Sequence, residues 1–132
     1  MCKNDCNCIS ELLKVICLLQ KNAETCDDVI ESCSKPTLGQ YSTICFNTRP
    51  IMLYTCNSNG ETPWSAPTTR DVTPESTSTV FRIEKIDNCC ATFRVLIANE
   101  DDTFTATQSF FTINLECICS IRCLGDTLVE NI

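Results

Sequence analysis

The feature that most constrains the fold of this chain is an alternation of apolar and polar side chains over residues 111–123. A period of two residues is typical of a β-strand, because successive side chains point to opposite faces of a sheet. Only Ile118 departs from this pattern, so the sequence predicts one long strand with its apolar face turned to the core. That face carries Phe111, Ile113, Leu115, Cys117, Cys119, Ile121 and Cys123.

Shorter strands are predicted upstream, at residues 44–46, 50–56, 80–86, 90–98 and 104–111. Turn-forming residues separate them, and the pair Asp87-Asn88 predicts a hairpin between two of them. Many short strands divided by turns are typical of a β-sandwich. We therefore predict a mainly β protein with a jelly-roll-like β-sandwich.

An amphipathic helix is predicted before the strands, starting at an Asn7 or Ser10 cap and stopping near Asn22. It packs either on its own domain or against a neighbouring subunit. Residues 1–8 are expected to form a flexible, cysteine-rich arm. We expect residues 1–40 to hold the arm, helix and connector, and residues 41–132 to form the β-sandwich assembly domain. The helical spacing is carried by Ile9, Leu12, Leu13, Ile16 and Leu19.

Charge and composition argue against several functions. The net charge is −7 with only 10 basic residues, which disfavours nucleic acid and anionic membrane surfaces. The chain has no histidine, which removes Ser-His-Asp and Cys-His catalysis, and it has no C-x-x-C redox motif. The apolar run at residues 12–19 is too short to span a bilayer and lacks a signal-peptide cleavage site. We expect a non-enzyme without cofactors, made in the cytosol and not inserted in a membrane.

The cysteine content points to cross-linking. The chain has 13 cysteines, an odd number, so at least one thiol cannot pair within its own chain. A chain of 132 residues can bury a stable core without disulfides. Disulfides beyond those the fold needs therefore make more sense between subunits. Cytosolic thiols stay reduced, however, so oxidation must follow exit from the reducing compartment, unless the thiols bind a metal.

The cysteines divide into two predicted classes. Cys117 and Cys119 lie on the expected core face, and an extended Cys89-Cys90 pair can direct only one thiol inward. The spacings C-x3-C-x-C and C-x-C-x3-C match no established zinc pattern, so we assign no metal ligands. The candidates for disulfides between subunits are Cys2, Cys6, Cys8, Cys26, Cys33 and Cys89. The candidates for core positions or links within the domain are Cys90, Cys117, Cys119 and Cys123.

Four blocks of sequence resemble the bacterial spore coat and exosporium family that includes CotY, CotZ and ExsY. The blocks are residues 47–55 (NTRPIMLYT), 81–86 (FRIEKI), 89–92 (CCAT) and 113–124 (INLECICSIRCL). The last block is the most specific, because it is similar to the family's closing Asp-Leu-x-Cys-x-Cys-x-Ile-x-Cys-Leu motif. Asn114 replaces the aspartate that is usual in relatives.

The resemblance implies a protein made in the mother cell of an endospore-forming bacterium and deposited on the spore surface. It implies self-assembly into hexagonal sheets that cysteines cross-link, with itself and other coat or exosporium proteins as partners. Oxidation after the mother cell lyses would reconcile cytosolic synthesis with the cysteine content. Two alternatives remain: an adaptor of the same fold that anchors a fibre or another coat component, and a cysteine-rich metal-binding protein.

Overall fold

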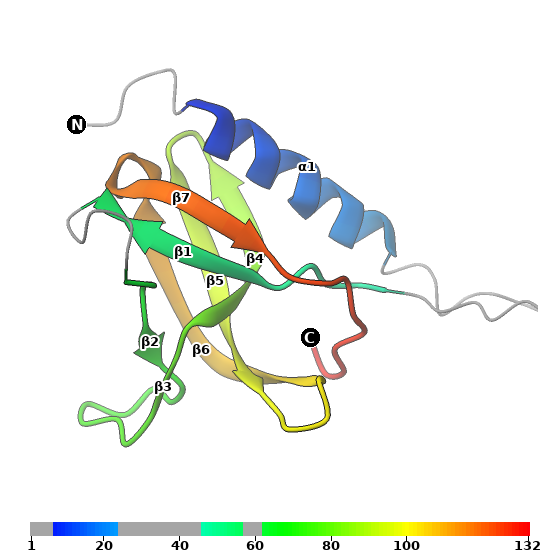
Figure 1. The fold of residues 1–132 in the computed structure, drawn as a ribbon, viewed down its shortest axis with the longest axis vertical. Helices are drawn as coiled ribbons and strands as arrows, with labels where there is room; N and C mark the ends of the chain where they lie inside the picture. Colours follow the sequence, from blue (N-terminus) through cyan, green and yellow to red (C-terminus); the bar gives the residue numbers. More distant parts are fainter. Residues whose placement is uncertain (1–6, 24–45, 57–61) are drawn as a thin grey trace, which may run out of the picture.

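The structure, a computed structural model, describes residues 7–23, 46–56 and 62–132 (Figure 1). Most of the expected strand at 44–46 and the expected domain boundary after residue 40 lie outside the described residues. The elements are helix α1 (Asn7–Ala23), strands β1 (Ile51–Thr55), β2 (Ala66–Pro67), β3 (Thr77–Ser78), β4 (Val80–Asp87), β5 (Cys90–Ala98) and β6 (Phe104–Asn114), the 3₁₀ helix η3 (Leu115–Cys117) and strand β7 (Ile118–Cys123).

Five of the strands form one antiparallel sheet in the order β6-β5-β4-β1-β7, and β2 pairs with β3 in a separate two-stranded ladder. The predicted hairpin is present as β4 and β5, which are joined at a turn where Asn88 adopts a positive φ of 59°. The prediction of a mainly β fold with an N-terminal amphipathic helix is confirmed. The finer jelly-roll arrangement stays a prediction.

The prediction of one long strand over 111–123 is wrong, because η3 interrupts it. The Asn114 side chain caps η3 by accepting a hydrogen bond of 3.0 Å from the Glu116 amide. The amide of Leu115 donates to the Cys89 carbonyl at 2.7 Å. These local bonds turn the chain, so that β6 and β7 become separate strands with their own pairing partners.

The short η3 link also requires the sheet to curl. Strands β6 and β7 occupy opposite edges of the sheet, and four inter-strand spacings in a flat sheet would separate them by about 19 Å. A 3₁₀ helix rises only about 2 Å per residue, so η3 spans much less than this distance. The edges must therefore approach each other at the end where η3 lies (Figure 1).

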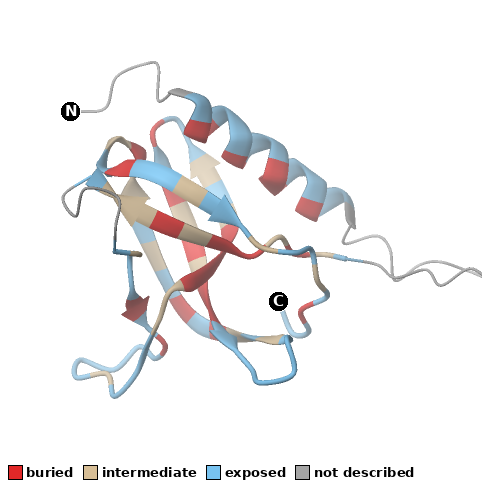
Figure 2. Ribbon diagram, in the orientation of Figure 1, coloured by how far each residue is buried: buried red, intermediate tan, exposed pale blue. Residues whose placement is uncertain are grey.

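The main hydrophobic core lies on the inner face of this curled sheet and continues onto α1. Three phenylalanines from β4, β5 and β6 form its centre. The Phe81 and Phe111 rings meet edge to face with centroids 4.8 Å apart, and Phe93 stacks on Phe111 at 5.5 Å. Figure 2 shows buried positions on these strands and on the side of α1 nearest the sheet. The helix and the sheet therefore share one core.

Helix α1 fills a gap between two strands of the sheet. Strands β1 and β4 pair only at Ile51 and Phe81 before they diverge. The buried side chain of Gln20 connects β4 with the residues just before β1: its Nε2 donates to the Ile83 carbonyl at 2.7 Å, and its Oε1 accepts from the Arg49 amide at 3.1 Å. A side-chain amide thus provides hydrogen bonds that a regular β-ladder would otherwise supply.

The helix differs in two respects from its prediction. It begins at Asn7, so Cys8 belongs to its first turn rather than to a flexible arm. Its buried face includes Leu13 and Ile16 as expected, but Leu12 and Leu19 are exposed. The described part of the chain contains no helix long and apolar enough to cross a membrane.

Candidate functional site

The cysteines within the described residues are either disulfide-bonded, free and exposed, or free and buried. Cys56 and Cys119 form a disulfide, and Cys89 is also disulfide-bonded. The free thiols are those of Cys8, Cys17, Cys90, Cys117 and Cys123, of which only Cys17 is buried. The remaining cysteines, Cys2, Cys6, Cys26, Cys33 and Cys45, lie outside the described residues, so their predicted role in cross-links stays a prediction.

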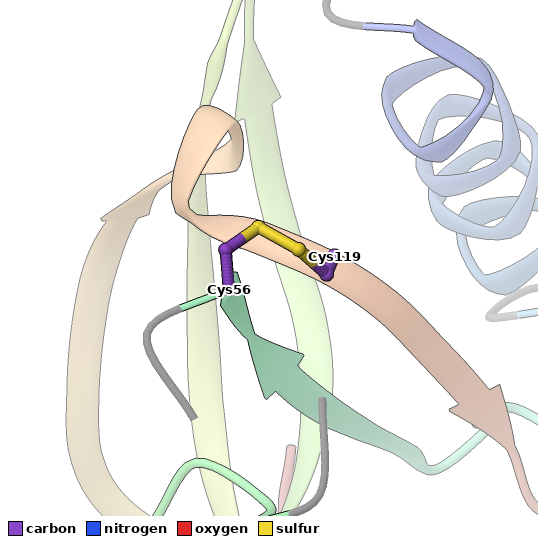
Figure 3. The surroundings of a disulfide bond; sticks show 2 residues. All are labelled: Cys56 and Cys119. Carbon is purple, nitrogen blue, oxygen red and sulfur yellow. A yellow bond between two sulfur atoms is a disulfide. The ribbon is translucent and has the colours of Figure 1, made fainter. Parts of the chain in front are cut away.

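The Cys56–Cys119 disulfide joins the residue after β1 to β7 (Figure 3). These strands are neighbours in the sheet, and Thr55 pairs with Ile118 beside the bridge. The bonded residues have Cα atoms 5.0 Å apart and are 63 positions apart in sequence. Closing a loop of that length constrains the unfolded chain and stabilises the fold by about 4 kcal/mol in the chain-entropy account. This disulfide therefore fastens the edge strand β7 to the rest of the sheet.

The adjacent pair Cys89-Cys90 has the opposite orientation to the one expected. Cys89, a candidate for links between subunits, is 1% exposed and lies in the hydrophobic core. Cys90, a candidate for a core position, is exposed and free. The reason is strand phase: Ala91 and Phe93 point inward from β5, so Cys90 must point outward.

The expected inward orientation of Cys117 and Cys119 is wrong, since both residues are exposed. Cys123, at the end of β7, is exposed as well. Ile118, the one residue out of pattern in the sequence, is buried directly after η3, and Ile121 packs on the core beyond a register irregularity between β1 and β7. Cys117 in η3 and Cys119 beside Ile118 are therefore at the surface, and Cys123 is exposed at the end of β7.

The cysteines of α1 have contrasting environments. Cys8 is exposed in the first turn of the helix. Cys17 is buried against the sheet, and its thiol donates a weak hydrogen bond of 3.7 Å to the Glu84 carbonyl. An oxidant or a neighbouring chain can reach the first thiol but not the second.

Topology brings three exposed free thiols to the same end of the molecule. The Ser10 hydroxyl donates to the Asn88 carbonyl at 3.3 Å, which places the first turns of α1 beside the β4–β5 turn. Cys90 begins β5 after that turn and pairs with Asn114, immediately before η3. We call this region the η3 end, and define it by the three free cysteines Cys8, Cys90 and Cys117.

The fourth exposed thiol lies elsewhere. Cys123 closes β7 and pairs with Ile51, at the strand end opposite to η3. Five residue steps along a strand separate it from Ile118 by about 17 Å. The exposed thiols of the described residues therefore occupy two separate parts of the surface.

An ion pair fixes the chain that follows Cys123. The Arg49 guanidinium meets the Asp126 carboxylate at 2.6 Å, with both side chains about one-third exposed. This hydrogen bond raises the pKa of Arg49 and lowers the pKa of Asp126. An isolated antiparallel β-bridge between Thr48 and Thr127 joins the same two segments. The segment after β7 is thus held against the segment before β1, which positions Cys123 at a fixed place.

No group of three or more cysteine, aspartate or glutamate side chains within 7–23, 46–56 and 62–132 is arranged to hold a metal ion. The chemistry that the described cysteines can perform is thiol–disulfide exchange. In exchange, a thiolate attacks a disulfide sulfur and displaces the other sulfur as a thiolate. In net oxidation, two thiols become one disulfide, and an oxidant takes up two electrons and two protons.

Comparison with known protein families gives a match over most of the chain. The family described as spore coat protein Z matches residues 2–109, which is most of the chain. The matched region includes α1, strands β1 to β5 and part of β6, and it ends before the closing block at 113–124. No curated protein and no solved structure matches the chain.

Proposed function

This chain belongs to the spore coat protein Z family, and from that premise we propose that it is a structural subunit that assembles with its own copies into a disulfide-crosslinked layer on the spore surface. In this proposal the layer is part of the coat or exosporium. The partners of the chain are its own copies and other proteins of that layer.

The placement of the exposed thiols is the observation that supports the proposal. An extended layer requires each subunit to bind neighbours on more than one side, as in a heterologous assembly that does not close. The η3 end offers Cys8, Cys90 and Cys117, and the far end of β7 offers Cys123. One subunit can therefore form covalent links in at least two directions while its own fold is held by other cysteines.

The proposed role is structural rather than catalytic. The family is one of spore coat proteins, and the sequence provides no histidine to act as a base for a nucleophilic thiol. Synthesis takes place in the reducing cytosol of the mother cell, where thiols stay free. Links form later, when an external oxidant such as oxygen or oxidised glutathione accepts two electrons and two protons for each new disulfide.

Oxidative assembly of the purified chain tests this function. The reduced protein is exposed to oxidised glutathione and examined by non-reducing electrophoresis and negative-stain electron microscopy. We expect a ladder of covalent multimers and extended sheets, both of which a reductant disperses. Protein whose exposed thiols are alkylated before oxidation is the control, and it should give no ladder.

Monomers alone after oxidation would contradict the proposal. Covalent dimers or small closed oligomers without sheets would contradict an extended lattice and would favour the adaptor alternative.

A further inference from the structure

The outer face of α1 carries an apolar stripe that nothing in the described residues covers. Leu12, Val15 and Leu19 are 41%, 52% and 51% exposed, and Cys8 is exposed in the same helix. These four positions follow one another at intervals of four, three and four residues, so they share one side of the helix. Figure 2 shows that this outer side of α1 is exposed along its length. We call these four residues the α1 stripe.

The spacing of the α1 stripe indicates the shape of its partner. Apolar residues at alternating intervals of three and four are the pattern by which one helix packs along another. The neighbouring face of α1, with Leu13 and Ile16, is already buried on the sheet, so the stripe is not the helix's own core face. Exposed Leu18 and Phe46 extend the apolar surface beside the stripe, and Phe46 lines the same surface cavity as Leu19.

We propose that α1 packs in parallel against α1 of a second copy of this chain, along the α1 stripe, and that a disulfide between the two Cys8 thiols locks the pair. This inference rests on the proposed self-assembly and identifies one contact within it. In such a pair a two-fold axis parallel to the helices relates the two chains. The same residues of both chains therefore form the contact.

The position of Cys8 decides the direction of the pair. In a parallel pair each residue of the stripe faces the same residue of the partner, which brings the two Cys8 side chains together. Disulfides form between Cα atoms about 4.4–6.8 Å apart, a separation that facing stripe positions can reach. In an antiparallel pair along the same stripe, Cys8 would instead face Leu19 of the partner helix, which has no thiol.

The helix contact is weak without a covalent bond, and this explains the role of the disulfide. The Leu and Val side chains of the α1 stripe are already about half buried, so pairing removes only the rest of their surface from water. Association also costs the two chains their independent translation and rotation. The helix pair alone is therefore weak and reversible. The disulfide makes it permanent: two Cys8 thiols give up two protons and two electrons to oxidised glutathione, which becomes two glutathione molecules.

Mass-spectrometric mapping of the oxidised full-length chain tests the pairing directly. A bridge between two Cys8 residues can only join two chains, because each chain has one Cys8, and fragmentation distinguishes it from a bridge at Cys6. We expect this bridge in the native chain. We expect Val15→Glu to reduce its yield at least about tenfold, a loss of roughly 1.4 kcal/mol of pairing. Lys14→Glu, an exposed change off the stripe, should leave the yield unchanged.

A second pair of variants tests the direction without Cys8. In a Cys8→Ser background, Leu19→Cys should form a bridge between the two introduced thiols, because parallel pairing places them opposite each other. Lys21→Cys, which is also exposed but lies off the stripe, should not.

The inference fails if Cys8 bridges only to other cysteines, or if the Leu19→Cys bridge does not form because the pair is antiparallel or another segment covers the stripe. If other bridges between chains persist in that case, the proposed layer survives. If no bridge joins two chains at any cysteine, the proposed function fails as well.

Discussion

Replacing Gln20 with leucine should lower the free energy of unfolding by about 2–4 kcal/mol. The change leaves two backbone groups without partners, the Ile83 carbonyl and the Arg49 amide, at the place where β1 and β4 have diverged. An unsatisfied buried polar group costs about 1–3 kcal/mol, and leucine can satisfy neither of them. The sheet should lose its connection across the gap that α1 fills.

Thermal and denaturant unfolding of the monomeric, disulfide-intact chain provide the measurement. For a chain of this size the loss corresponds to a fall in Tm of about 10 °C. Lys21→Leu is the matched control, because it introduces the same residue at the next, exposed position of the helix. Equal stability of the two variants would show that Gln20 does not bridge the strands.

Replacing the four exposed free cysteines together with serine, at Cys8, Cys90, Cys117 and Cys123, should remove most large covalent multimers. Serine cannot form a disulfide, and these positions hold the exposed free thiols of residues 7–23, 46–56 and 62–132. The Cys56–Cys119 bridge is untouched, so the fold and its melting temperature should change little.

Non-reducing electrophoresis after oxidation measures this effect. Cys17→Ala is the control, because Cys17 is a free thiol that the sheet covers, and this variant should form the same ladder as the native chain. A full ladder from the four-serine variant would assign the cross-links to other cysteines and would contradict a cross-linking role for the four exposed thiols.

Local patterns in the sequence predicted the elements of this fold well. The helical spacing around Leu13 and Ile16 identified α1, and the turn at Asp87-Asn88 identified the β4–β5 hairpin. Both predictions depend on neighbours in sequence, which periodicity records directly. The family resemblance is confirmed by the match to the spore coat protein Z family.

The break at η3 was harder to predict, because both sides of it keep an alternating pattern. One local signal was present: Asn114 is a residue type that caps helical turns, and Ile118 was out of phase with the strand. The contact that secures the turn, from the Leu115 amide to the Cys89 carbonyl, joins residues that only the fold brings together. The exposure of Cys117 follows from this turn, so it could not be predicted from the strand pattern.

Long-range pairing also explains the burial of a charged residue. Arg82 is 3% exposed, although the alternation around it would assign it to a surface face. It is held by the Glu84 carboxylate at 2.7 Å and by the Thr48 hydroxyl at 3.0 Å. Thr48 is far away in the sequence, and no local pattern indicates that it lies beside Arg82.

The central claim is that exposed thiols on the folded subunit join neighbouring chains, and disulfide mapping of mixed chains tests it most directly. Protein labelled with heavy nitrogen is mixed with unlabelled protein, oxidised into assemblies, digested without reduction and analysed by mass spectrometry. The account predicts bridged peptides at Cys90, Cys117 or Cys123 with one heavy and one light half, while Cys56–Cys119 peptides are uniformly heavy or light. If every bridge in the assemblies proves uniformly labelled, no disulfide joins two chains and the account is wrong.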